Sequence, residues 1–304
     1  MQVKKINEAE WWDFVERCPT ATFFHTPDWY RVWKEYLGWK MEARYFSFKS
    51  GNTAMLPLNS SKRWKGLMKQ YTSGPMGTYG GIITNAPLSE QEITTLKNYL
   101  NRFYSLQIRM NPLNTIMQEA WVTKRDFTQI ISLSKGWETI FKQWTKGHSS
   151  AAKKGIREGV QIRVADHKDW KTYYNIYQKS RERWGASASN NYNWKLFALI
   201  RQIDKNKCKL WLAFINEKII SGCLCFYYNQ HVVYWHGGSL DEYFHLKPVH
   251  VLQHHIIKEA IQEGFKWYDF NPSGGHEGVV RFKKGFGTEF LASNIYRKQF
   301  LSIL

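Results

Sequence analysis

A pattern of strand, polar turn and returning strand occurs once in each half of this 304-residue chain. The first copy covers residues 43–58, with its turn at 49–52. The second covers residues 210–226, with its turn at 216–218, and a third strand follows at 231–236. Short apolar and aromatic runs around polar turns predict antiparallel hairpins. The repetition favours a duplicated unit that combines strands with helices.

Apolar residues at helical spacing predict helices around these hairpins. The predicted helices lie at 8–17, from Asp28 onward, at 137–144 and at 248–264. A short strand at 267–270 and a glycine-rich loop at 271–278 follow the last helix. A boundary near residue 130 separates two domains, 1–130 and 131–304. The expected fold class is therefore α/β (α+β).

The chain is strongly basic, and its charge is unevenly distributed. Lys and Arg number 43 against 25 Asp and Glu, which gives a net charge of +18. Residues 43–89 contain no Asp or Glu, and residues 142–163 form a second basic cluster. Such clusters either bind an anionic partner or form a solvated surface. Two of them in one chain favour a phosphate-bearing ligand.

Missing motifs argue against dinucleotide-binding enzymes, nucleotide-triphosphate enzymes and hydrolases with a GxSxG serine. The sequence has no GxGxxG, GxxxxGK[ST] or GxSxG motif, and its four cysteines form no CxxC pair. His250 and His254 have the spacing of a zinc pair on a helix, but Val251 stands where a metalloprotease has Glu, so we expect no metal. The chain has no signal-like N-terminal segment and no run of 18 apolar residues. We therefore expect a cytoplasmic protein with reduced cysteines and no transmembrane segment.

Two stretches near the C-terminus carry a family resemblance. Residues 268–270 (Tyr-Asp-Phe) and residues 282–287 (Phe-Lys-Lys-Gly-Phe-Gly) resemble the C-terminal signature of the Fem-family (FemABX-like) aminoacyl and peptidyl transferases. Residues 23–29 and 55–58 resemble N-terminal motifs of that family, and residues 148–164 resemble the basic helix that opens its second domain. The resemblance implies two tandem GNAT-like domains, each with a mixed, mostly antiparallel sheet flanked by helices.

The resemblance also implies transfer of an acyl group to an amine. Phe282 and Lys283 would then stabilise the transition state and bind the donor terminus. A cation aimed at the developing oxyanion is worth about 3 kcal/mol, so Lys283 is the leading catalytic candidate. The residues themselves make Asp269, at a strand end, and His236, before a glycine pair, candidates for acid and base roles. Asp269 could instead cap the following loop, and His236 could be structural.

The binding candidates fall into two sets. The donor-binding candidates are Lys153, Lys154, Arg157, Lys284, Gly285 and Gly287. The acceptor-binding candidates are Trp29, Tyr30, Arg63, Lys65 and Tyr79. Core packing would explain Trp29 and Tyr30 equally well.

The donor remains open between aminoacyl-tRNA and an acyl-coenzyme A. Residues 243–250 stand where a coenzyme A enzyme places its pyrophosphate loop, and they contain no glycine, which disfavours coenzyme A. The leading expectation is transfer from aminoacyl-tRNA to a cell-envelope precursor or another small amine, with no required cofactor and possible peripheral contact with an anionic membrane. The chain is too short for the helical-hairpin insertion that many cell-wall members of the family carry. The alternatives are an acyl-coenzyme A-dependent N-acetyltransferase acting on an amino sugar or polysaccharide precursor, and a non-catalytic module that binds RNA or an anionic polymer on Trp64, Trp144 and Trp184.

Overall fold

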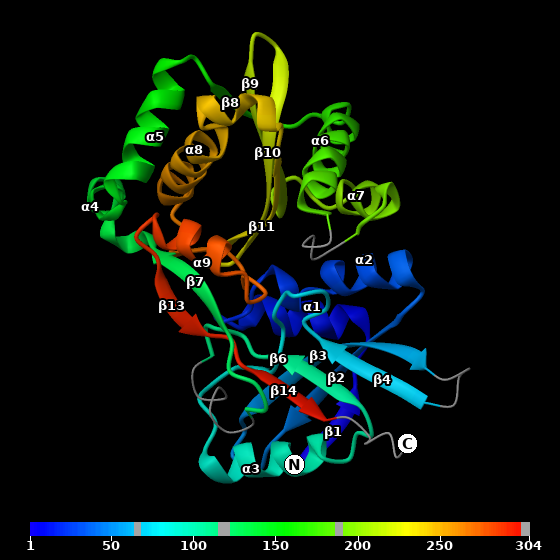
Figure 1. Cartoon of the computed structure of the whole chain (residues 1–304). Helices are drawn as coiled ribbons and strands as arrows, with labels where there is room; N and C mark the ends of the chain where they lie inside the picture. The colour runs from blue at the N-terminus through cyan, green and yellow to red at the C-terminus, as the bar shows by residue number, and fades with distance from the viewer. Residues whose placement is uncertain (64–67, 115–121, 186–190, 299–304) are drawn as a thin grey trace. The chain divides into compact units, whose positions relative to one another are not determined.

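The described residues divide into two units. The computed structural model describes residues 1–63, 68–114, 122–185 and 191–298 (Figure 1). Unit 1 consists of residues 1–128 together with the chain from Leu291 onward, and unit 2 consists of residues 129–290.

Unit 1 is built on a mixed sheet in the order β1-β2-β3-β4-β6-β14, with β5 paired to β3. Within the described residues its strands are β1 (Gln2–Lys5), β2 (Lys40–Ser47), β3 (Thr53–Arg63), β4 (Met68–Ser73), β5 (Ile83–Thr84), β6 (Leu106–Arg109) and β14 (Ile295–Lys298). Its helices are α1 (Glu8–Arg17), α2 (Pro27–Leu37) and α3 (Glu90–Leu100), with a 3-10 turn at Phe23–His25. The β4–β6 pair is parallel, whereas β2 and β3 form the predicted antiparallel hairpin.

Local sequence signals explain where the first helices begin and end. Asn7 caps α1 and forms a capping box with Glu10, which satisfies backbone donors at the helix start. Pro27 occupies the first turn of α2, where its missing N–H costs nothing. The helix ends at Gly38, whose φ of 70° is left-handed. The predicted helices at 8–17 and from Asp28 are therefore confirmed.

Unit 2 is built on a second mixed sheet in the order β13-β7-β12-β11-β10-β9-β8. Within the described residues its strands are β7 (Phe127–Ser132), β8 (Gln161–Val164), β9 (Cys208–Ile215), β10 (Lys218–Tyr228), β11 (His231–Ser239), β12 (Trp267–Asp269) and β13 (Glu289–Ala292). Its helices are α4 (Trp137–Gln143), α5 (Lys146–Arg157), α6 (Asp169–Trp184), α7 (Trp194–Ile200), α8 (Pro248–Gln262) and α9 (Glu277–Lys284), with 3-10 turns at Leu133–Lys135 and Asp241–Leu246. The predicted three-stranded meander corresponds to β9, β10 and β11, and its pairing is antiparallel as expected.

Helices α6 and α8 cover opposite faces of this sheet (Figure 1). Gly222 of β10 lies against the ring of Tyr173 on α6. The next residue, Cys223, accepts a hydrogen bond from Gln253 on α8 at 3.6 Å. Because neighbouring residues of a strand point to opposite faces, the two helices enclose the sheet between them. Both units therefore have the predicted fold class, a mixed sheet flanked by helices.

The sheet of unit 2 divides at one end. β11 and β12 are parallel, and the described pairing joins only His231–Val233 of β11 to Trp267–Asp269 of β12. β11 continues to Ser239 while β12 stops at Asp269. The two strands therefore part after the pair Val233 and Asp269, and the chain leaving β12 runs toward α9.

The structure differs from the sequence-based prediction in three places. The predicted loop at 271–278 ends early, because α9 begins at Glu277 and includes the residues expected to form a turn. The basic helix expected over 148–164 ends at Arg157, because Gly159 adopts a φ of 86° and β8 follows. Unit 2 was expected to extend to residue 304, whereas β14 pairs with β6 inside unit 1.

Candidate active site

Lys283 is a buried lysine on α9, only 5% exposed. Its Nζ donates a hydrogen bond to the main-chain oxygen of Asn271 at 2.6 Å. Burial lowers the pKa of Lys283 to about 8, and the negative charge of Asp269 opposes this shift. A lysine is rarely buried unless it is paired or functional, so this position is the first feature of the candidate site.

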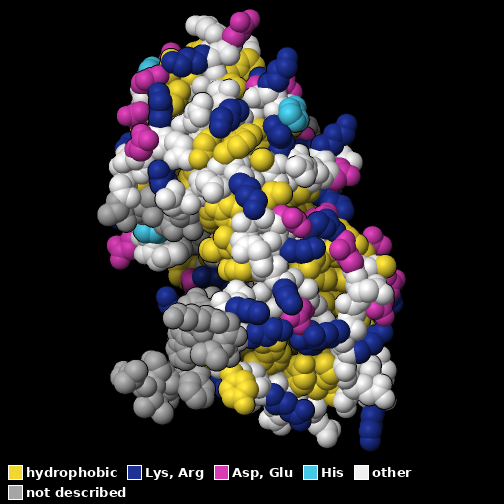
Figure 2. Space-filling model, turned by 90° about the vertical axis from the view of Figure 1, so that its right-hand side faces the viewer, with side chains coloured by type: hydrophobic (Ala, Val, Ile, Leu, Met, Phe, Trp, Pro, Cys, Tyr) yellow, Lys and Arg dark blue, Asp and Glu magenta, His cyan; other side chains and the backbone are white. Residues whose placement is uncertain are grey.

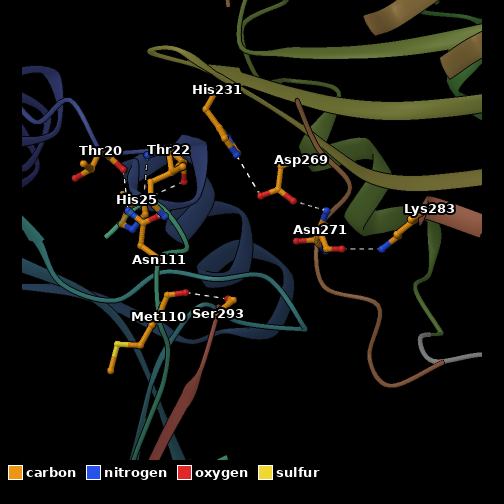
Figure 3. A network of polar contacts seen from close by, with 11 residues as sticks. Thr20, Thr22, His25, Met110, Asn111, His231, Asp269, Asn271, Lys283 and Ser293 are labelled. Atoms are coloured by element: carbon orange, nitrogen blue, oxygen red, sulfur yellow. Dashed lines mark hydrogen bonds and ion pairs between the residues drawn. The ribbon is translucent and has the colours of Figure 1, made fainter. Parts of the chain in front are cut away.

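Asp269 and Asn271 connect Lys283 to the end of β12 (Figure 3). Asp269 is fully buried, and its Oδ1 accepts the backbone N–H of Asn271 at 2.7 Å. Its Oδ2 lies 3.3 Å from Nε2 of His231, the first residue of β11. The network of His231, Asp269, Asn271 and Lys283 is thus continuous through the Asp269 carboxylate and the main chain of Asn271. It lies where β11 and β12 part.

Asn271 has a backbone conformation that its side-chain type tolerates. Its φ is 58°, in the left-handed region where Asn is favoured over most non-glycine residues. Asp269 stabilises this turn by accepting the N–H two residues on, as Asp commonly does at a strand end. The capping role considered for Asp269 is therefore present, and a role for it in proton transfer stays a prediction.

Phe282 and the signature glycines pack α9 against α4 and α5. The ring of Phe282 lies 5.3 Å from the ring of His148, and the Phe282 carbonyl accepts a hydrogen bond from His148 Nε2 at 3.0 Å. A Cβ on Gly285 would come within 2.2 Å of the His148 ring. Gly287 has a φ of 73° and lies against Gln143. These contacts give both glycines a packing role, while their predicted contact with the donor remains untested.

His236 lies in a separate cluster on the α6 face of the sheet. Its Nδ1 is 2.6 Å from the hydroxyl of Tyr173, and the rings of Tyr177 and Phe197 surround it. Burial lowers the pKa of His236 to about 4, so the imidazole is neutral near pH 7. A base with so low a pKa accepts protons weakly. In addition, no hydrogen bond given for the described residues links His236 to the Lys283 network.

The basic donor-binding candidates lie on α5 and α9. Lys153 and Arg157 are exposed and four residues apart, so they share one face of α5. Lys153 lies 5.6 Å over the ring of Phe141, Lys154 is half-buried, and Lys284 is exposed. Figure 2 shows one face of the molecule, on which Lys and Arg side chains are dispersed among acidic and apolar ones. Donor contact by these cations stays a prediction.

The acceptor-binding candidates divide between the core and the undescribed part of the chain. Trp29, Tyr30 and Tyr79 are fully buried in unit 1. Their burial agrees with the core-packing alternative and leaves them no exposed surface for an acceptor. The Arg63 side chain and Lys65 lie outside the described residues.

The aromatic residues of the binding-module alternative also differ in their surroundings. Trp144 is buried in the core of unit 2, where a stacked base could not reach it. Trp184 is exposed. Trp64 lies outside the described residues.

The described residues form neither a metal-binding cluster nor a membrane-spanning helix. No group of three or more His, Cys, Asp or Glu side chains there is placed to hold a metal ion. His250 instead lies 4.8 Å from the ring of His148, and His254 packs against Trp137. None of the described helices is both long and apolar enough to cross a membrane.

Two residues of the network were missed by the sequence analysis. The sequence places Asn271 in a glycine-rich loop, and the turn signal that could have identified it is an Asn two residues after a strand-end Asp. His231 is, from the sequence, simply the first residue of the predicted strand at 231–236. Nothing in its local sequence indicates that a strand far along the chain brings Asp269 beside it.

Comparisons with known proteins identify the fold. Residues 145–284 match the family model described as an acetyltransferase (GNAT) domain, a range that includes the whole Lys283 network. The crystal structure of FemX is 14% identical, with a TM-score of 0.76, and the match covers 98% of this chain and 97% of FemX. No curated protein matches the chain significantly.

Two further solved structures have the same fold. The C-terminal domain (DUF2156) of a candidate lysylphosphatidylglycerol synthetase from Agrobacterium fabrum is 11% identical, with a TM-score of 0.58 and coverage of 96% of this chain and 92% of that domain. A conserved protein of unknown function from Bacteroides thetaiotaomicron is 9% identical, with a TM-score of 0.55 and coverage of 97% and 99%. The expected resemblance is confirmed at the level of fold: the chain has the fold of FemX, and residues 145–284 of unit 2 match the acetyltransferase (GNAT) domain model.

Proposed function

We propose that this protein is an aminoacyltransferase that moves an aminoacyl group from aminoacyl-tRNA to the amine of a cell-envelope precursor or of another small acceptor. The observation that carries the proposal is the buried ammonium of Lys283, held by the Asn271 carbonyl where β11 and β12 part. The matched GNAT domain and the FemX-like fold over 98% of the chain support the reaction class.

In the proposed reaction the amine attacks the ester carbonyl of the donor. A C–N bond forms, the C–O ester bond breaks, and the amine proton ends on the departing ribose hydroxyl. Negative charge develops on the former carbonyl oxygen during the attack. Lys283 can stabilise that charge, because the described residues engage only one of its three N–H donors.

The start of α8 supports a donor other than coenzyme A. A pyrophosphate is usually held by free backbone N–H groups at a helix N-terminus. Here Pro248 has no N–H, and the N–H groups of His250 and Val251 both donate to the carbonyl of Lys247. This helix end therefore offers a phosphate few donors. The net charge of +18 and the exposed cations of α5 favour a polyanionic donor such as tRNA.

An acyl-coenzyme A-dependent N-acetyltransferase is the second candidate, since the matched family model is that of an acetyltransferase domain. The experiment that separates the two uses purified protein at physiological salt. Charged tRNA, uncharged tRNA and acetyl-coenzyme A are tested for binding and for transfer to two amine probes, a short lysine peptide and glucosamine. We expect transfer from charged tRNA alone. Transfer from acetyl-coenzyme A would favour the second candidate, and binding of RNA without any transfer would favour a non-catalytic module.

Location and peripheral contacts follow the same proposal. A tRNA donor places the reaction in the cytoplasm, where charged tRNA is made. An acceptor that is a membrane-linked precursor would bring this basic protein near an anionic lipid surface.

A further inference from the structure

Asn271 is the residue through which the Lys283 network passes. It is 8% exposed. Its N–H donates to Asp269 and its carbonyl accepts from Lys283. Both main-chain polar groups are thus used, and the left-handed φ of 58° fixes the direction of the side chain relative to them.

The side-chain oxygen of Asn271, in contrast to its main-chain groups, has no hydrogen-bond partner among the described residues. This Oδ1 atom is buried, and among the described residues no donor reaches it. Leaving a buried acceptor unsatisfied costs about 1–3 kcal/mol, so such groups nearly always have a partner in the functional state. Since no described donor reaches Asn271 Oδ1, an N–H of a bound molecule can supply the hydrogen bond that this oxygen accepts.

Gln129 provides a useful comparison. It also has a buried side-chain oxygen without a described donor beside α9. Its Nε2, however, donates to Val280 O at 3.1 Å and to Thr288 Oγ1 at 3.0 Å, so the Gln129 amide anchors α9 to the sheet. The amide of Asn271 makes no such contact within the described residues, so it does not join two elements of the fold.

We infer that the Asn271 side-chain amide binds the attacking amine of the acyl acceptor. This assignment rests on the proposed acyl transfer and adds the group that holds the nucleophile. Asn271 Oδ1 accepts one amine N–H, which leaves the nitrogen lone pair free to attack. The main-chain carbonyl of the same residue holds Lys283, so one residue places the amine and the oxyanion-stabilising cation side by side. The ligand class is a neutral primary or secondary amine.

The variant Asn271→Gly tests this assignment cleanly. Glycine accepts the left-handed φ and keeps the N–H and carbonyl that bind Asp269 and Lys283, so only the amide is lost. We expect kcat/KM for the amine to fall about tenfold, the equivalent of one hydrogen bond. The KM for the donor and the alkaline limb of the pH profile should stay unchanged. Asn216→Gly is the matched control, because Asn216 has a φ of 46° in an exposed hairpin turn.

A second variant distinguishes the loss of the amide from a folding defect in Asn271→Gly. Asn271→Asp keeps an acceptor oxygen and tolerates the same φ, so it should retain more activity toward the amine than Asn271→Gly. Wild-type amine kinetics in Asn271→Gly, or equal losses toward donor and amine, would overturn the assignment. Failure of the wild-type protein to acylate any amine would instead overturn the proposed function, so the two results are distinguishable.

Discussion

The imidazole of His148 occupies the space that a side chain at position 285 would need. A Cβ on Gly285 would lie 2.2 Å from Cε1 of His148. The same imidazole donates through Nε2 to the carbonyl of Phe282, one residue before Lys283. The glycine of the signature therefore lets α5 hold the last turn of α9, the turn that carries Lys283.

Gly285→Ala should destabilise unit 2 by about 1–3 kcal/mol, the usual cost of overpacking a tight contact. The measurement is the free energy of unfolding from urea titration. Gly278→Ala is the matched control, because Gly278 is in the first turn of α9, the helix that Gly285 caps, and a Cβ there would meet nothing within 4 Å. That control should be neutral or slightly stabilising.

A double-mutant cycle with His148→Ala isolates the contact. Removing the imidazole makes room for the new methyl group, so the double variant should lose less stability than the sum of the single losses. Strict additivity would show that Gly285 and His148 do not constrain each other.

The stability of unit 2 should fall as the pH falls from about 6.5 toward 4. Burial lowers the pKa of His250 and of His254 to about 4, with Lys247 and His148 adding to the shift of His250, and Lys258 and His255 to that of His254. The unfolded chain takes up these protons near pH 6.5, so acid favours unfolding. Their stabilising contribution is complete above pH 6.5 and is lost on acidification.

Urea unfolding at pH 7 and pH 5 checks this acid sensitivity. His254→Phe keeps an aromatic ring against Trp137 and removes one titrating group, so its loss of stability between the two pH values should be smaller than that of the wild type. An identical loss in both proteins would contradict the role of His254.

Asp269→Asn should move the alkaline limb of the activity profile to lower pH. The Asp269 charge raises the pKa of Lys283 against the effect of burial, so its removal lowers that pKa further below about 8. The ammonium then loses its proton at lower pH, and oxyanion stabilisation is lost with it. The Asn side chain still offers an oxygen to the Asn271 N–H. The measurement is kcat/KM from pH 6 to 9.5, with the exposed Asp241→Asn as control. An alkaline limb that stays at the same pH would show that the charge of Asp269 does not affect the pKa of Lys283.

Features set by nearby residues were predictable from the sequence. The hairpin of β2 and β3 and the meander of β9 to β11 are defined by alternation around short turns, and both were predicted. The helix α8 was recognisable from its apolar face between Pro248 and Gly264. Lys283 was found through a motif resemblance, and its burial agrees with a functional role.

Features that depend on distant pairing were not predictable. β14 pairs with β6, which lies almost 190 residues earlier in the sequence, and no local pattern in Ile295–Lys298 predicts this pairing. The glycines at 274, 275 and 278 led to the prediction of a loop where α9 begins, because glycine disfavours a helix unless packing stabilises it. Asp269 and His231 meet only because β11 and β12 are adjacent in the sheet.

The most direct test of the central claim is the single-turnover rate of aminoacyl transfer by Lys283→Met. Methionine preserves the buried stem and removes only the ammonium, so the variant should fold and bind tRNA as the wild type does. The exposed Lys205→Met serves as control. The account predicts a loss of roughly 100-fold or more in the transfer rate, the effect of removing one oxyanion-stabilising donor. Full transfer activity in a folded Lys283→Met protein would contradict it.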